Sequence, residues 1–243
     1  MKQKAHRTTT AAASHTNVTA TLIFYAAVAA VVVAAVFMVI GVLTPARSGP
    51  FAKPADIVPY PYTNVAAFVP VDYIWLYPGI LLAPVFILLM ACIKKNDSEQ
   101  RKLFGRISLS FATMYAALIV ADYFIQLAVI QPSLRSGETS GLSLFTQYNP
   151  HGLFIALEAI GYLLMSTSLL FASFQFSGTA LQRAVKWIFI SDFCLAVVAF
   201  ILLCLVNFDI IAFEVTALSI NWLALISGGI LIGILARRGW TGA

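Results

Sequence analysis

Six stretches of this chain are apolar over lengths that allow a helix to cross a lipid bilayer. The hydrocarbon core of a bilayer is about 30 Å thick, so a spanning helix needs about 20 mostly apolar residues. Helices are suited to this medium because they satisfy all their own backbone hydrogen bonds. The chain is therefore predicted to be an all-α, polytopic membrane helix bundle with one transmembrane domain over residues 20–236. The six predicted transmembrane helices are residues 20–43, 71–93, 107–130, 151–176, 184–206 and 210–236.

The composition excludes an ordinary soluble domain. The 243 residues are 60% hydrophobic and only 10% charged, whereas soluble domains carry about 25% charged residues. A net charge of +5 raises the question of nucleic acid. The basic residues stand at the ends of predicted spans, however, and form no nucleic-acid-binding pattern, so we expect no nucleic-acid partner. The expected partner is the lipid bilayer, and the expected location is the plasma membrane.

The basic residues also predict the orientation, because segments rich in Lys and Arg stay on the cytoplasmic side. With the N-terminus inside, twelve of the fifteen Lys and Arg residues fall on inner segments. Only Arg47, Lys53 and Arg135 fall on outer segments. Both termini are therefore expected to be cytoplasmic. Residues 1–19 are predicted to be a disordered basic tail, because they are polar and Thr-rich, and residues 237–243 a short cytoplasmic C-terminal tail.

The segment between the first two predicted spans, residues 44–71, contains six prolines. Such a segment is not expected to form a helix and is predicted to lie extended over the membrane face. Aromatic residues around its second half are expected to form an interfacial belt, since Tyr and Trp favour the boundary between lipid and water. Stacking against a ligand is the alternative for the same residues. These aromatic residues are Tyr60, Tyr62, Tyr73, Trp75 and Tyr77.

Two sets of small residues predict close packing between helices. Ala26, Ala30 and Ala34 recur every four residues and form a smooth face on the first predicted span. Gly229 and Gly233 form a GxxxG pair in the sixth. Small residues let two membrane helices approach closely. The alternative for the alanines is that they are simply part of an Ala-rich span.

Polar residues interrupt the outer halves of three predicted spans. Residues three, four or seven positions apart lie on one face of a helix, and each of these spans carries one such polar pair. We expect the three pairs to meet in a single outward-facing pocket that binds a ligand or a proton. The pairs are Asp122 with Gln126, His151 with Glu158, and Glu214 with Asn221.

A carboxylate inside a bilayer has to be paired or protonated. No Lys or Arg lies within a span near Asp122 or Glu158, so we expect these two groups to share a proton that His151 exchanges with water. The alternative is that the polar side chains only join helices by hydrogen bonds. Asp192 lies in the inner half of the fifth span, and whether it belongs to a second site is left open. Ser166, Thr167 and Ser168 lie at a matching depth.

Several chemistries lack the residues that they need. His151 is the one histidine outside the N-terminal tail, so neither a multi-histidine zinc site nor a haem held by two histidines is expected. No G-x-S-x-G motif and no CxxC pair is present, which disfavours serine-hydrolase and thiol redox chemistry. No ExxH pair supports a carboxylate-bridged metal site. We therefore expect no metal and no cofactor.

Three functions remain. We favour the binding or transport of a small solute or proton in the outward-facing pocket. The second is an intramembrane enzyme that uses Asp122 and Glu158 as general acid and base on a lipid-soluble substrate. The third is a structural or assembly subunit that packs against a membrane protein partner. The six-span layout and the small-residue first span resemble the substrate-binding subunits of vitamin-uptake transporters in architecture, with no shared sequence motif.

Overall fold

The structure is a computed structural model that describes residues 2–93, 98–206 and 209–241. These ranges contain helices and turns and no β-strand. Six of the helices, counting α3 together with its continuation, are long and apolar enough to cross a membrane, which confirms the predicted all-α bundle. The helices are α1 (Lys2–Leu43), α2 (Leu76–Ile93), α3 (Glu99–Ile125), α4 (Gln131–Ser136), α5 (Leu153–Ser173), α6 (Ala180–Val206) and α7 (Ile210–Arg237).

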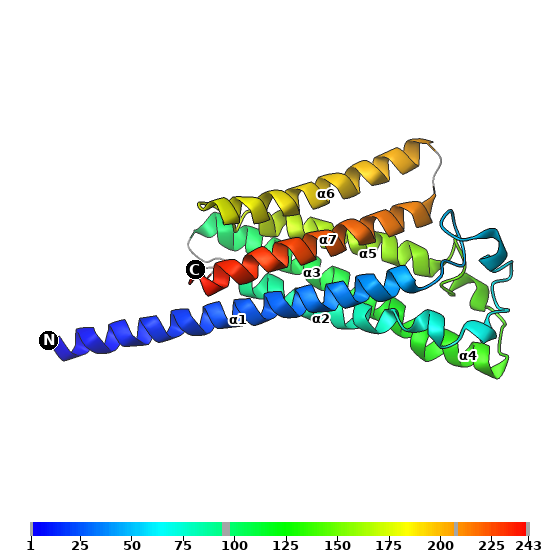
Figure 1. Ribbon diagram of the computed structural model, residues 1–243, viewed down its shortest axis with the longest axis horizontal. Helices are drawn as coiled ribbons and strands as arrows, with labels where there is room; N and C mark the ends of the chain where they lie inside the picture. Colours follow the sequence, from blue (N-terminus) through cyan, green and yellow to red (C-terminus); the bar gives the residue numbers. More distant parts are fainter. Residues whose placement is uncertain (1, 94–97, 207–208, 242–243) are drawn as a thin grey trace.

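The long helices run side by side along one axis (Figure 1). Each of α1, α2, α3, α5, α6 and α7 packs against the next in this order, and α7 returns to pack against α1. A direct contact between α5 and α7 leaves α6 at the edge of the bundle (Figure 1). Both chain ends lie toward the same end of the bundle, as an even number of spans requires. Which end is cytoplasmic stays a prediction. The described residues do not include Lys94 and Lys95, on which that prediction partly rests. They also do not include residues 242–243 of the predicted C-terminal tail.

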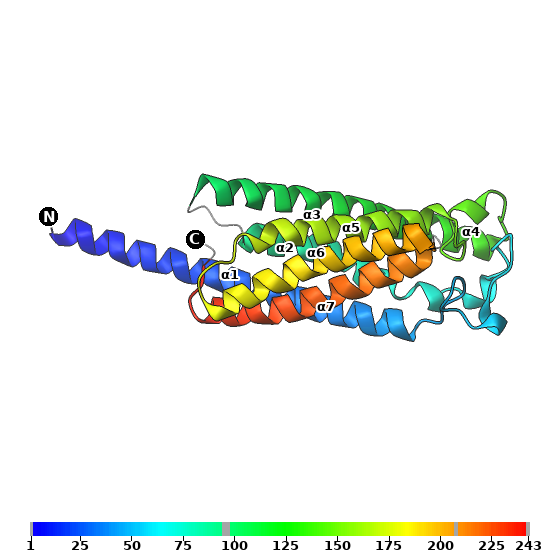
Figure 2. The ribbon, with the colours of Figure 1, turned by 90° about the horizontal axis from the view of Figure 1, so that it is seen from above.

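The first helix begins at Lys2, although residues 1–19 were predicted to be disordered. Its apolar part is Val18–Leu43, close to the predicted span. The polar part continues the same helix and projects beyond the bundle (Figures 1 and 2). Adding a residue to an existing helix costs far less than starting one. Ala and Lys, which are strong helix formers, recur in this segment.

The third span is longer than predicted and runs from Glu99 to Ser136. Ser98 caps its start, because the Ser98 side chain accepts a hydrogen bond from the Arg101 backbone N–H at 3.3 Å. A π turn over Gln126–Ile130 joins α3 to α4. Pro132 follows this turn and cannot donate a backbone hydrogen bond, so the widened turn lets the helix continue past a residue that would otherwise break it.

The loop between α1 and α2 is less extended than predicted, because it contains short 3₁₀ turns. The first of them starts with Pro54, and proline is tolerated in the first turn of a helix, where its missing N–H has no partner to lose. The described 3₁₀ turns of this segment are Pro54–Asp56, Ala66–Phe68 and Val71–Tyr73.

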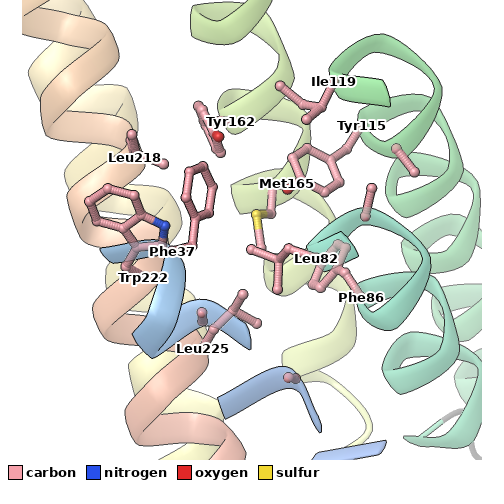
Figure 3. Close-up of a cluster of buried hydrophobic side chains, with 14 of the residues drawn as sticks. Phe37, Leu82, Phe86, Tyr115, Ile119, Tyr162, Met165, Leu218, Trp222 and Leu225 are labelled. Atoms are coloured by element: carbon pink, nitrogen blue, oxygen red, sulfur yellow. The ribbon is translucent and has the colours of Figure 1, made fainter. Parts of the chain in front are cut away.

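Aromatic rings fill the centre of the bundle near this loop. The Phe37 ring of α1 lies 5.0 Å from the Trp222 ring of α7 and 5.9 Å from the Trp75 ring, centroid to centroid. Figure 3 shows the Phe37 ring between Trp222 and Met165, with labelled side chains of α2 and α3 on the far side of Met165. The half of the bundle nearer this loop is therefore closely packed around α1, α5 and α7.

The predicted small-residue faces lie in packed regions. Ala26, Ala30 and Ala34 are all buried in the hydrophobic core. A Cβ atom on Gly229 would lie 2.6 Å from Cγ2 of Val31, so α1 and α7 approach closely at this glycine. A Cβ atom on Gly233 would lie 3.8 Å from the nearest atom outside its own helix, which is ordinary van der Waals contact.

The two glycines should respond differently to alanine. Gly229→Ala is expected to lower the free energy of unfolding by about 1–3 kcal/mol, because the methyl group overpacks the contact with Val31. Gly233→Ala is the matched control and should be close to neutral. Thermal unfolding in detergent measures both. Adding Val31→Ala should restore most of the loss in Gly229→Ala, and equal effects at the two glycines would contradict this packing.

Candidate functional site

A cavity of about 620 Å³ opens at the end of the bundle opposite the chain termini. We call it the distal cavity. It lies between the end of α1, the first turns of α5 and α7, and the loop that joins α1 to α2. Its volume falls in the usual range for small-molecule sites, about 300–1,000 Å³. The lining includes Arg47, Asp72, Tyr148, Glu158, Glu214 and Trp222.

The distal cavity closes where α1 meets α7. A Cβ atom on Gly41 would lie 2.9 Å from Cη2 of Trp222, so the glycine backbone and the indole ring are in contact. Gly41 and Trp222 are also the lining residues farthest from the loop on their helices. A side chain at Gly41 would require the Trp222 ring, which forms the floor of the distal cavity, to shift.

Two carboxyl groups line the deep part of the cavity. Glu158 comes from α5 and Glu214 from α7, and their exposed fractions are 1% and 5%. Glu214 lies close enough to interact electrostatically with Glu158. Among the ion pairs of the described residues, none includes either group. The structure therefore brings together two carboxyl groups that carry no cationic partner from the described chain.

A buried tyrosine holds Glu158, and a second tyrosine contacts the first. The Tyr123 hydroxyl donates a hydrogen bond to Oε1 of Glu158, and it lies 2.6 Å from the Tyr162 hydroxyl. Both rings are fully buried. A phenol donor stabilises an ionised carboxylate more than a neutral carboxyl. Helical spacing of polar residues did not indicate Tyr123, although it is the direct neighbour of Asp122.

Asp122 is buried but does not line the distal cavity. Its Oδ2 atom has no hydrogen-bond partner among the described residues. It interacts electrostatically with Glu158, so it is near the carboxyl group with which it was predicted to share a proton. On α3, however, it is Tyr123 that contacts Glu158.

Gln126 holds the loop that precedes α5. Its side-chain amide donates to the Phe145 carbonyl at 2.6 Å and accepts from the Gln147 backbone N–H at 3.2 Å. Gln147 lines the cavity and donates to the Asp72 carbonyl at 3.2 Å. Gln126 therefore positions part of the cavity wall without reaching the cavity itself.

His151 and Asn221 also lie outside the cavity lining. His151 is exposed, and its backbone N–H donates to Oδ1 of Asn149 at 2.9 Å. Asn221 is buried, and its amide donates to the Tyr162 carbonyl at 3.2 Å and to Oγ of Ser166 at 3.0 Å. Asn221 thus joins α7 to α5, which matches the helix-joining alternative for these polar residues.

Asp192 of α6 is buried at a separate position. Of the three residues predicted at a matching depth, Ser166 has its side chain beside the Asp192 carboxyl group. Ser168 is directed elsewhere, since its hydroxyl donates to the Ser108 carbonyl of α3 at 2.8 Å. Thr167 donates to a carbonyl of its own helix. Asp192 does not line the distal cavity.

An ion pair fixes the mouth of the cavity. Nε of Arg47 lies 2.9 Å from Oδ2 of Asp72, and the guanidinium also lies 3.8 Å from a carboxylate oxygen of Asp56. The Arg47 guanidinium stacks 3.8 Å above the Phe68 ring, and the Tyr148 hydroxyl donates to Asp72 at 3.4 Å. The hydrogen bond to Asp72 raises the pKa of Arg47, so this group stays charged.

The aromatic residues expected at the membrane interface divide into two groups. Tyr60 and Tyr77 are exposed. Tyr73 is fully buried, and Trp75 stacks on Phe37 and lines the cavity. Trp75 thus lies where the alternative, stacking against a ligand, would place it.

Comparisons with protein-family models, with curated proteins and with solved structures found no match. Within the described residues, no three histidine, cysteine or carboxylate side chains lie together in an arrangement that holds a metal ion. The fold and the site together define a multi-pass helical membrane protein with a carboxylate-lined cavity at one end.

The ion pair at the mouth should stabilise the fold. Arg47→Gln is expected to lower the free energy of unfolding by about 3 kcal/mol, because it leaves the Asp72 carboxylate buried without its cation. Thermal unfolding in detergent measures the effect. Lys53→Gln is the control, since Lys53 is an exposed cation on the same cavity lining. Asp72→Asn should recover part of the loss in Arg47→Gln, and equal stabilities for Arg47→Gln and Lys53→Gln would contradict the role of the pair.

Proposed function

We propose that the distal cavity binds a small organic cation. One observation carries this: Glu158 and Glu214, from different helices, line one cavity and have no ion-pair partner among the described residues. A carboxylate in an apolar environment is costly unless a cation or a proton neutralises it. A positively charged solute between the two groups would supply that charge.

The aromatic part of the lining suits an organic cation. The rings of Trp75, Phe154 and Trp222 line the cavity beside the carboxyl groups. Aromatic faces attract ammonium groups, and the attraction is strongest where water is excluded. A site for a bare metal ion would need more oxygen ligands close together, whereas a cavity of about 620 Å³ has room for a cation with an apolar body.

Protons and the solute would compete for the same carboxyl groups. In the empty site, at least one of Glu158 and Glu214 keeps a proton, because two adjacent buried carboxylates repel each other. Binding of the cation displaces the proton, and Tyr123 then donates its hydrogen bond to an ionised Glu158. A site that exchanges a proton for a cation is suited to transport that couples proton movement to cation movement. We extend the proposal to such transport across the plasma membrane.

The other two hypotheses have less support. The intramembrane enzyme requires Asp122 and Glu158 to face one substrate, and Asp122 is not part of the cavity lining. The assembly subunit requires a surface for a partner. The large apolar residues exposed on α6 are equally suited to contact with lipid.

Neutral replacements in the cavity should weaken cation binding. We expect Glu158→Gln and Glu214→Gln each to raise the Kd for tetramethylammonium about tenfold or more, since each loses an ionic contact of about 1.4 kcal/mol or more. Titration calorimetry in detergent, first with tetramethylammonium and then with larger alkylammonium ions, measures the affinities.

Glu138→Gln is the matched control, because Glu138 is an exposed carboxylate in the loop before α5. It should bind as the wild type does. If every alkylammonium ion bound the wild type and both cavity variants with the same Kd, the cavity carboxylates would not be the site.

Binding should also depend on pH. Tetramethylammonium keeps its charge at every pH, so a change in its affinity reports on the protein. We expect its Kd to rise as the pH falls from about 8 to about 5, because protonation of the carboxyl groups competes with the cation. A Kd that stays constant over this range would contradict the competition.

A further inference from the structure

A second pocket lies at the opposite end of the bundle, between the first turn of α6 and the end of α7. We call it the proximal pocket, and its volume is about 380 Å³. Both chain segments that form it lie at the end that carries the chain termini (Figure 1). Its lining contains no Asp or Glu and consists of Thr179, Ala180, Leu181, Gln182, Leu235, Arg238, Gly239 and Trp240.

The first residues of α6 line this pocket. Thr179 caps the helix, since its hydroxyl oxygen accepts a hydrogen bond from the Gln182 N–H at 3.3 Å. The N–H groups of Ala180 and Leu181 have no acceptor within the helix, and both residues line the pocket. The N-terminal end of a helix carries a partial positive charge and binds anions.

Trp240, which follows the end of α7, adds a hydrogen-bond donor to the pocket. Its indole N–H is buried and has no hydrogen-bond partner among the described residues. The ring stacks on Phe176, with the centroids 5.1 Å apart. Gly239 adopts a positive φ of 83°, and the Trp240 backbone N–H then donates to the Leu235 carbonyl at 3.0 Å. This turn at the end of α7 fixes the indole group beside the start of α6.

Gln182 is a second unpartnered group in the pocket. Its side chain is 8% exposed, and Oε1 has no hydrogen-bond partner in the described ranges. A buried polar atom without a partner is unusual and points to water, an ion or a ligand. As an acceptor, Oε1 suits a hydroxyl group next to the anion.

Arg238 supplies a full positive charge. It is exposed and lines the pocket. Arg183 directly follows the pocket residue Gln182 in α6, and Arg237 precedes Arg238. Basic pockets between membrane helices at the interface bind phospholipid headgroups, and an arginine side chain matches the geometry of a phosphate.

We propose that the proximal pocket binds a phosphate group, either in the hydroxyl-bearing headgroup of an anionic phospholipid or in a free phosphate. The N–H groups of α6, the Trp240 indole and Arg238 donate to the phosphate oxygens. Gln182 accepts from a headgroup hydroxyl. This site is separate from the distal cavity and does not depend on the function proposed for it.

The test measures the thermal unfolding of the full chain in dodecyl maltoside. The additions are dioleoylphosphatidylglycerol, dioleoylphosphatidylcholine and inorganic phosphate, each added alone. We expect phosphatidylglycerol to raise Tm more than phosphatidylcholine does, because the first is anionic and carries hydroxyl groups. A shift with inorganic phosphate alone would assign the site to a free phosphate, and a shift with the lipid alone would assign it to a headgroup.

Variants link the shift to the pocket. Arg238→Gln and Trp240→Phe should each reduce the Tm shift to about half or less, since each removes one donor to the phosphate. Arg106→Gln and Trp187→Phe are the controls, because they make the same changes at exposed positions outside the pocket. Both controls should keep the full shift. Trp240→Phe keeps the stacking ring, so it tests the site even if Arg238→Gln does not fold.

Two results would overturn the proposal. One is a Tm shift that is equal for the two lipids, with no effect of inorganic phosphate. The other is a phosphate or lipid shift that survives in both Arg238→Gln and Trp240→Phe.

Discussion

The burial of Glu158 and Glu214 among apolar helices is the constraint on which the site depends. A carboxyl group in such surroundings is stable only with a proton, a cation or a hydrogen-bond donor beside it. The structure provides one donor, the Tyr123 hydroxyl, and a cavity that reaches both groups. It provides no cationic partner from the described chain. The remaining neutralising charge therefore has to come from a proton or from a bound solute. The protonation of the two carboxyl groups then depends on whether a solute is bound.

The walls of the distal cavity are held by contacts that lie outside its deepest part. The Arg47–Asp72 ion pair joins the loop after α1 to the start of the second span. Gln126 hydrogen-bonds the loop before α5 on the side away from the cavity. The contact between Gly41 and Trp222 closes the floor. These contacts keep an opening between helices that pack closely elsewhere. At the other end of the bundle, polar groups converge on a pocket with the opposite electrostatic character, so the two ends are suited to ligands of opposite charge.

Hydrophobic length is a local property, and for this reason the number of spans could be predicted from the sequence, although the third span is longer than predicted. Helical spacing and depth also predicted that Glu158 and Glu214 lie near each other, and both line the distal cavity. Spacing does not determine how a helix is rotated against its neighbours, because packing decides it. Asp122 and Tyr123 are adjacent and differ in direction by about 100° on a helix, and it is Tyr123 that contacts Glu158. The Arg47–Asp72 pair joins residues 25 positions apart, across a loop whose path no local pattern predicts.

Infrared difference spectroscopy of the carboxyl groups tests the central claim most directly, because it separates protonated carboxyl from carboxylate. We predict that adding tetramethylammonium to the wild type converts carboxyl signal into carboxylate signal. We also predict that the conversion disappears in a protein that carries both Glu158→Gln and Glu214→Gln. A wild-type spectrum without any carboxyl change on saturation with the cation, or a change that persists in the double variant, would contradict the claim that these two groups hold the solute.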